Sequence, residues 1–208
     1  MKIDIEELKE IAQQAGDAIM AIYGEKDFAV ELKDDQSPLT AADKASHEVI
    51  IAGLQKHWPD IPILSEEGGD IPYEERKNWQ HFWLLDPLDG TKEFIKRNGE
   101  FTVNIALIER NQPTIGVVYV PAQQKHYWGI VGEGAWTQTG EGAPVSIQVR
   151  QPDQEKGLTV VVSRSHPSKE LEEYLKNIKV ADALPVGSSL KLCVVAEGKA
   201  DLYPRLGP

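Results

Sequence analysis

Three acidic residues follow two short apolar stretches of the sequence. Asp86 and Asp89 come after residues 81–85, in a stretch that also holds a proline and a glycine, and Glu66 comes after residues 61–64. Folds that combine helices and strands tend to place active-site groups where a strand ends. If these two strand ends meet, three carboxylates crowd together, and such a cluster must either take up protons or bind cations.

The donor atoms of this cluster indicate which cation it would bind. No histidine or cysteine accompanies the three acids, so all ligand atoms are oxygens, which favours Mg²⁺ over Zn²⁺. Two such cations could clamp a phosphate and activate a water molecule. An ordinary structural explanation stays open, because Asp-Pro-Leu-Asp-Gly is good turn chemistry and two acids before a glycine are typical of a solvated loop.

The composition restricts the class of protein. The chain has 208 residues, of which 41% are hydrophobic and 26% charged, as expected for a globular protein with a buried core. Its formal net charge of −11 argues against binding a nucleic-acid polymer, whose phosphates need a basic surface. A small anionic substrate is compatible with this charge, because divalent cations reverse the sign of a carboxylate site.

Several features predict a cytoplasmic protein. No apolar run approaches the roughly 18 residues that span a bilayer, and acids lie among the first seven residues, where a signal peptide would become apolar. With Cys193 as the single cysteine of the sequence, an internal disulfide cannot form, which fits a reducing compartment. A peripheral association with the cytoplasmic face of the inner membrane stays open, as does the choice between monomer and homodimer.

The spacing of apolar residues predicts the elements that position the acids. We expect helices at 5–23, from about 40, at about 168–178 and from about 188, and strands at 81–85, 101–107, 115–120, 126–131 and 158–163. Alternating helices and strands, together with a run of consecutive strands, favour a layered α+β enzyme. The turn-prone stretch 151–157 predicts a boundary between an N-terminal domain at 1–152 and a second domain at 153–208.

Three blocks of the sequence resemble the lithium-sensitive inositol monophosphatase superfamily in their order and separations. They are residues 37–43 (SPLTAAD), the pair Glu66-Glu67, and residues 83–91 (WLLDPLDGT). The resemblance continues through nearly the whole chain. It implies a layered αβαβα fold of the sugar phosphatase type and a phosphatase that uses two or three Mg²⁺ ions.

The resemblance also implies a metal-binding role for single residues. Glu66, Asp86 and the carbonyl of Leu88 would hold one Mg²⁺, and Asp86 and Asp89 would hold a second, so that Asp86 bridges both. Glu66, Leu88 and Asp89 would in addition lie against the substrate.

The resemblance also assigns residues that would bind the phosphate and residues that would act on the attacking water. Gly90 and Thr91 would offer backbone N–H groups to the phosphate at the start of a short helix. The hydroxyl of Thr91, supported by Asp43, would orient the water and help to deprotonate it. The spacing of Thr40 and Asp43 also fits a helix-capping role for Asp43, and both roles can coexist.

Three later segments bear on the substrate: residues 163–166 (SRSH), 187–191 (GSSLK) and 203–205 (YPR). Each has an ordinary explanation as a strand-end loop, an N-cap serine or an exposed cation. Together they supply an imidazole, a hydroxyl at a helix N-terminus and two cations, which suit a second phosphate or a nucleotide.

These segments resemble the 3′(2′),5′-bisphosphate nucleotidases of the bacterial CysQ type. The resemblance implies hydrolysis of adenosine 3′,5′-bisphosphate, a by-product of sulfate assimilation, to AMP and phosphate. His166, Ser188, Lys191 and Arg205 would hold the nucleotide.

The family carries one more metal-binding aspartate shortly after the Arg-Leu-Gly-Pro stretch, whereas this sequence ends at Pro208. We therefore expect a truncated second domain, a second Mg²⁺ site that lacks one acid, and little catalysis by the 208-residue chain. Two alternatives stay open. One is an inositol monophosphatase, which would not need Lys191 and Arg205, and the other is a non-catalytic fragment that binds metal and nucleotide.

Overall fold

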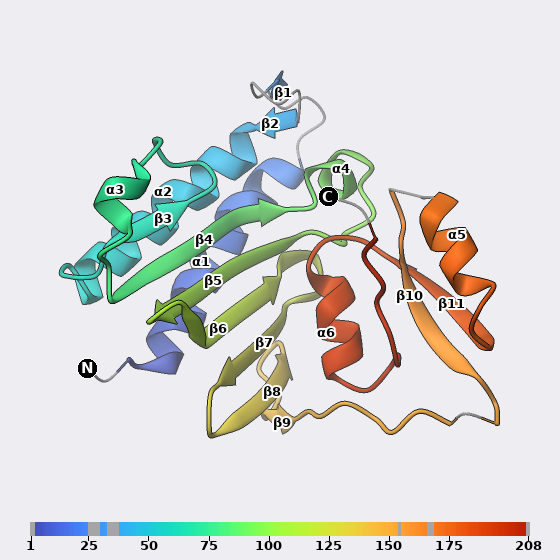
Figure 1. Ribbon diagram of the computed structural model, residues 1–208. Helices are drawn as coiled ribbons and strands as arrows, with labels where there is room; N and C mark the ends of the chain where they lie inside the picture. Colours follow the sequence, from blue (N-terminus) through green and yellow to red (C-terminus); the bar gives the residue numbers. More distant parts are fainter. Residues whose placement is uncertain (1–2, 25–29, 33–37, 154, 166–168, 207–208) are drawn as a thin grey trace.

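A seven-stranded sheet forms the centre of the structure, a computed structural model that describes residues 3–24, 30–32, 38–153, 155–165 and 169–206 (Figure 1). Its strands follow one another across the sheet in chain order. The first pair is parallel and each later pair is antiparallel. The strands are β3 (Ile63–Ser65), β4 (His81–Asp89), β5 (Thr102–Glu109), β6 (Gln112–Val120), β7 (Lys125–Ile130), β8 (Gly134–Thr139) and β9 (Val145–Ser146).

Two long helices, α1 (Ile5–Tyr23) and α2 (Ala41–His57), cover one face of this sheet (Figure 1). α1 begins where the Asp4 side chain accepts a hydrogen bond of 3.0 Å from the Glu6 N–H, which caps the helix. Apolar side chains at helical spacing then face the sheet. The core between the helices and the sheet includes Leu8, Ile11, Ala15, Ile19, Ile50, Leu54, Trp83, Leu85, Val103, Ile105 and Val117.

The opposite face of the sheet carries α6 (Leu190–Ala196). Val117 of β6 packs in the core beneath α1 and α2, whereas the buried Val120 packs with Leu190 and Cys193 of α6. Successive side chains of a strand point to opposite faces, so α6 lies across the sheet from α1 and α2.

A second, smaller layer lies beyond α6 (Figure 1). It is the parallel pair β10 (Leu158–Ser163) and β11 (Val180–Val186), followed outward by α5 (Lys169–Leu175). The layers therefore run helix, sheet, helix, sheet, helix, which confirms the expected αβαβα fold.

The remaining elements are short. They are the antiparallel pair β1 (Val30–Leu32) and β2 (Pro38–Thr40), the helices α3 (Tyr73–Arg76) and α4 (Thr91–Ile95), and a 3₁₀ turn at Pro121–Gln123. Within the described ranges, no helix has both the length and the apolar character needed to cross a membrane.

Most predicted elements are confirmed, with some changes of length. The helix expected from about residue 40 begins at Ala41, and the strand expected at 81–85 continues to Asp89. The predicted helix at 168–178 is shorter, because α5 ends at Leu175, and the helix expected near 188 begins at Leu190. The division at residue 152 stays a prediction.

Among the strands that were not predicted, β8 and β11 owe their stability to distant partners. β8 (GAWTQT) is half polar, and it pairs with β7 so that the rings of Trp136 and Trp128 stack with centroids 6.1 Å apart. β11 contains Pro185 and lacks a clear apolar alternation, and it pairs in parallel with β10.

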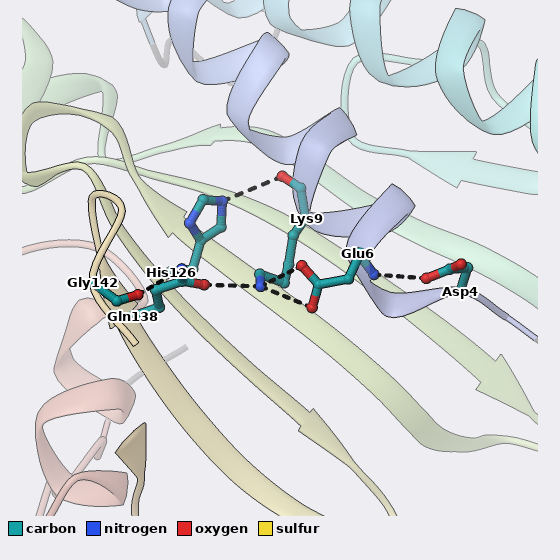
Figure 2. Close-up of polar contacts among 6 residues, drawn as sticks. All are labelled: Asp4, Glu6, Lys9, His126, Gln138 and Gly142. Atoms are coloured by element: carbon teal, nitrogen blue, oxygen red, sulfur yellow. Dashed lines mark hydrogen bonds and ion pairs between the residues drawn. The ribbon is translucent and has the colours of Figure 1, made fainter. Parts of the chain in front are cut away.

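A polar cluster around the buried Lys9 joins the start of α1 to the sheet (Figure 2). Lys9 is only 6% exposed, and its ammonium donates to both carboxylate oxygens of Glu6 at 3.0 and 2.8 Å and to Gln138 at 2.9 Å. The same ammonium lies 4.3 Å from the centroid of the Trp128 ring. A buried charge is tolerated when its donors are satisfied in this way. His126 of β7 lies 3.2 Å from the Lys9 carbonyl through Nε2, which therefore carries the proton.

His126 is expected to make the stability of the protein depend on pH. Burial lowers its pKa from 6.5 to about 4, and the nearby charge of Lys9 acts in the same direction. The unfolded chain takes up a proton as the pH falls below about 6.5 while the folded ring stays neutral, so stability declines between about pH 6.5 and 4. The shift corresponds to about 3 kcal/mol.

Urea unfolding at pH 7 and at pH 4 tests this expectation. In a His126→Gln variant, which does not titrate, the loss of unfolding free energy between the two pH values should be smaller by that amount. An equal loss in the variant and the parent protein would contradict it.

Candidate active site

The parallel pairing of β3 with β4 brings Glu66 to Asp86. Ser65 pairs with Leu85, and the Glu66 N–H donates to the Leu85 carbonyl at 3.2 Å. Each acid is thus the next residue after a paired position. Because parallel strands end at the same edge of a sheet, the two apolar stretches identified in the sequence deliver their carboxylates to one place.

Asp89 reaches the same place through an irregularity at the end of β4. Asp86 pairs with Asn104 and Asp89 pairs with Thr102, so β4 holds one residue more than β5 between these pairs. Such a bulge bends a strand and redirects its side chains. Ser46 of α2 donates to the Pro87 carbonyl at 2.7 Å, which holds this segment against the helix. The predicted turn is therefore part of a bulged strand.

Glu66, Asp86 and Asp89 line a single cavity of about 560 Å³ on the face of the sheet opposite α1. Apolar side chains of neighbouring strands form part of its lining, and Asn104 and Ser189 add polar groups. The three acids therefore share the lining of one cavity, and their binding of a metal ion stays a prediction.

Burial raises the pKa of Asp89, and the negative charges of Glu66 and Glu93 raise it further. The positive charge of Lys191 and a hydrogen bond from the Ser189 backbone N–H oppose this rise. Asp89 therefore interacts both with neighbouring carboxylates and with Ser189 and Lys191 at the start of α6. Carboxylates crowded in this way bind a cation favourably, because the cation relieves both burial and repulsion.

Gly90 links Asp89 to α4 in a conformation that suits glycine. Its φ is +94°, and its carbonyl accepts the Phe94 N–H at 2.9 Å to start the helix. A Cβ at this position would lie 3.1 Å from the Ser188 Cβ, 3.2 Å from the Glu100 carbonyl oxygen and 3.3 Å from the Phe101 Cα. The loop of Asp86 and Asp89 therefore packs closely against the segment that opens α6.

Asp43 is 2% exposed and lies in the first turn of α2. Ser46, one turn later, holds the Pro87 carbonyl, so this part of α2 lies against the loop of Asp86 and Asp89. The catalytic and capping roles of Asp43 both stay predictions, and the side chain of Thr40 lies outside the described residues.

The side chains of Ser188 and Ser189 have different hydrogen-bond partners. Ser188 is buried with φ at +46°, and its Oγ accepts the N–H of Leu190, the first residue of α6, at 3.2 Å. The Ser189 Oγ lies 2.9 Å from the Thr102 Oγ1 and donates to the Asn104 Oδ1 at 2.7 Å. The sequence singled out Ser188, whereas Ser189 is the serine bonded to the strand beside the acids.

Lys191 lies close to the acids. Burial lowers its pKa, the charges of Asp89 and Glu93 raise it, and the charge of Arg205 lowers it. The ammonium also lies 5.7 Å from the centroid of the Tyr203 ring. Lys191 is therefore close enough to interact with Asp89 on one side and with Arg205, the other expected nucleotide-binding cation, on the other. His166 lies outside the described residues.

Comparison with known proteins identifies this combination of fold and site. The model of the inositol monophosphatase family matches residues 4–208. The chain belongs to the inositol monophosphatase family. It is therefore a phosphatase of a family that generally depends on metal ions.

Curated members of the family include close relatives of the chain. The 3′(2′),5′-bisphosphate nucleotidase CysQ of Salmonella typhimurium is 53% identical over 206 residues, which cover 98% of this chain and 81% of the relative. The protein of that name from Escherichia coli strain K12 is 52% identical over the same shares.

Solved structures of the family match the fold. CysQ from Bacteroides thetaiotaomicron superposes with a TM-score of 0.83 at 40% identity, over 97% of this chain and 79% of the other. The suppressor protein SuhB from Bartonella henselae gives a TM-score of 0.81 at 25% identity, over 97% and 78%.

The cavity of this phosphatase suits a hard divalent cation. Among the described residues, no three acidic, histidine or cysteine side chains already close around a common point as in a preformed metal cage. The lining supplies oxygen donors from Glu66, Asp86 and Asp89, and no histidine or cysteine ligand.

Several residues near the site were given no individual role in the sequence analysis. Thr102 and Asn104 lie on the β5 face that carries the cavity, and Glu93, Glu100 and Arg164 contact the segments around it. Ser165 and Arg164 belong to a motif that the sequence did single out. The others carried no signal, because their importance depends on pairing across 64 to 87 positions of the chain.

Proposed function

We propose that this chain is a Mg²⁺-dependent 3′(2′),5′-bisphosphate nucleotidase that hydrolyses adenosine 3′,5′-bisphosphate to AMP and phosphate. The observation that carries the proposal is the position of Lys191, whose ammonium interacts with Asp89 of the carboxylate cavity and with the second cation, Arg205. A carboxylate cavity with metal takes one phosphate, and a neighbouring pair of cations suits a second. Relatives of that name at 53% identity support the same substrate.

The acids would hold the metal ions. Glu66, Asp86 and the Leu88 carbonyl would bind one Mg²⁺, and Asp86 and Asp89 a second, with a third ion as a further option in this family. Bound there, the ions would polarise the phosphate oxygens and lower the pKa of a water molecule. The raised pKa of Asp89 supports this assignment, since its carboxylate is buried near other negative charges.

The chain's own residues would orient the phosphate and move the proton. Backbone N–H groups of Gly90 and Thr91 would donate to phosphate oxygens. The Thr91 Oγ would accept a proton from the attacking water while passing its own hydroxyl proton to the Asp43 carboxylate. The water oxygen would form its bond to phosphorus as the bond to the 3′ oxygen breaks, and that leaving oxygen would take up a proton from a solvent water.

The remainder of the nucleotide would lie toward α6. Lys191 and Arg205 would pair with the 5′ phosphate. The Ser188 Oγ accepts the Leu190 N–H, so its own O–H remains able to donate to the substrate. A contact from His166 rests on the sequence resemblance.

Substitution of the two cations tests the proposal. Lys191→Ala and Arg205→Ala should each weaken binding of adenosine 3′,5′-bisphosphate far more than binding of a simple phosphate monoester. A lost charged contact costs about 1.5–3 kcal/mol, or at least about 10-fold in affinity. Calorimetric titration with Mg²⁺ present measures both ligands, and Lys156→Ala is a matched control because this lysine is exposed and pairs with Asp153.

The alternatives predict different results. Equal weakening for both ligands would favour an inositol monophosphatase. Tight nucleotide binding with no phosphate release at saturating Mg²⁺ would favour a non-catalytic module that binds metal and nucleotide.

A further inference from the structure

Glu93 of α4 is a buried acid that none of the roles above uses. It lies four residues after Asp89 and is only 4% exposed. Its Oε1 accepts the Ser165 hydroxyl at 2.5 Å, and that hydroxyl in turn accepts the Lys96 ammonium at 2.9 Å. Burying a carboxylate is costly, so such a residue is retained where its charge or shape serves neighbouring groups.

The stem of Glu93 packs directly against Gly187, the residue before the two serines that open α6. A Cβ on Gly187 would lie 2.4 Å from the Glu93 Cγ and 2.9 Å from its Cδ. On its other side, the Gly187 N–H donates to the Glu100 Oε2 at 2.8 Å. The backbone that leads into Lys191 is therefore held between two acids.

Glu100 extends this contact to the end of β10. Its carboxylate accepts two hydrogen bonds from the Arg164 guanidinium, at 2.8 and 2.7 Å, and the same guanidinium donates to the Pro185 carbonyl at 2.5 Å. Residues 163–165 and 185–187 are thus held by Glu93 and Glu100, which follow the loop of Asp86 and Asp89 in the chain.

The charge of Glu93 also acts on Lys191. Burial of Lys191 disfavours its charged form, and the nearby charges of Asp89 and Glu93 oppose that effect. Glu93 therefore contacts the Gly187 to Lys191 segment and also interacts with the charge of the Lys191 ammonium. It does so from α4, the helix that follows the loop of Asp86 and Asp89.

We propose that Glu93 is a positioning residue that sets selectivity for a substrate with a second phosphate, because it holds the Gly187 to Lys191 segment against the metal-binding loop. This inference rests on the proposed function. In this proposal the residue that determines selectivity lies in α4, beside the reacting phosphate. It is distinct from Lys191 and Arg205, the cations that would contact the second phosphate.

Steady-state kinetics of the Mg²⁺-loaded protein with adenosine 3′,5′-bisphosphate and with a simple phosphate monoester test the proposal. Glu93→Gln keeps the size and the acceptor for Ser165 but removes the charge. It should raise KM for the bisphosphate about 10-fold more than KM for the monoester, with kcat changed much less. Glu93→Asp, which keeps the charge, should recover part of this selectivity, and Glu172→Gln on α5 serves as the surface control.

A second variant and a binding measurement keep the test independent of folding. Gly187→Ala should displace Glu93 and produce the same selective loss, and calorimetric titration below the melting temperature measures nucleotide affinity without turnover. If the parent protein prefers the bisphosphate but Glu93→Gln weakens both ligands equally or neither, the positioning role is wrong while the proposed function stands. If the parent protein shows no preference for the bisphosphate, the proposed function itself fails.

Discussion

Asp86→Asn should reduce phosphate release by at least about 1000-fold, equivalent to roughly 4 kcal/mol in the activation barrier. Asp86 lies between Glu66 and Asp89 in the cavity, so in the proposed mechanism it is the acid that would bind both ions. Asparagine keeps the shape of the side chain and the backbone pairing with Asn104, but it lacks the charge that binds the cations.

The same substitution should leave the metal-free protein folded, with a melting temperature within about 3 °C of the parent. Removing one of several crowded carboxylates relieves repulsion when no cation is present. Titration with Mn²⁺ should show weakened ion binding, which is a readout that does not need turnover. Asp70→Asn, on the exposed loop after Glu66, is the control and should retain ion binding.

The opposite pattern would contradict the metal role. A melting temperature that falls by many degrees without Mg²⁺, combined with unchanged Mn²⁺ binding, would mean that Asp86 serves the bulge of β4 as a structural residue.

Gly90→Ala should destabilise the protein by about 2–4 kcal/mol and reduce turnover roughly 100-fold. Two costs add at this position. An alanine at a φ of +94° is strained, and its Cβ would press on the Glu100 carbonyl oxygen and the Phe101 Cα, which are backbone atoms that cannot rotate away. Relief of this crowding would shift the loop of Asp89 and Thr91, and a displacement of about 1 Å at a reacting centre is costly.

Two other glycines separate these costs. Gly132 has a φ of +85°, and a Cβ added there would meet no atom within 4 Å, whereas Gly69 has neither a positive φ nor a close neighbour. Urea unfolding of Gly132→Ala therefore measures the dihedral strain alone, and Gly69→Ala provides the baseline. A loss in Gly90→Ala no greater than that in Gly132→Ala would show that packing against the backbone of Glu100 and Phe101 does not constrain the loop.

Local patterns were sufficient for the elements that carry their own signal. The apolar spacing of α1 and the alternation in β5 arise from each segment facing the core with one side, so a single stretch of sequence reveals them. The acids Glu66, Asp86 and Asp89 were recognisable for a related reason. Each comes shortly after an apolar stretch of the sequence, so the pattern can be seen without knowledge of the fold.

The tertiary structure decided the features that depend on distant pairs. β8 and β11 exist through pairing with β7 and β10, and their own composition is a weak guide. The sequence singled out Ser188, but it could not show that the Ser188 Oγ accepts the Leu190 N–H while the Ser189 Oγ bonds Asn104, 85 positions away.

The order of residues was therefore enough to predict the layered fold, the three candidate carboxylates and the family to which the chain belongs. The groups around those carboxylates became visible in the folded chain, namely Lys191 and Ser189 beside Asp89, and Glu93 against Gly187. The physical reason is that local propensities act within a few residues, whereas the electrostatics and packing of a site depend on segments joined only when the layers close on one another.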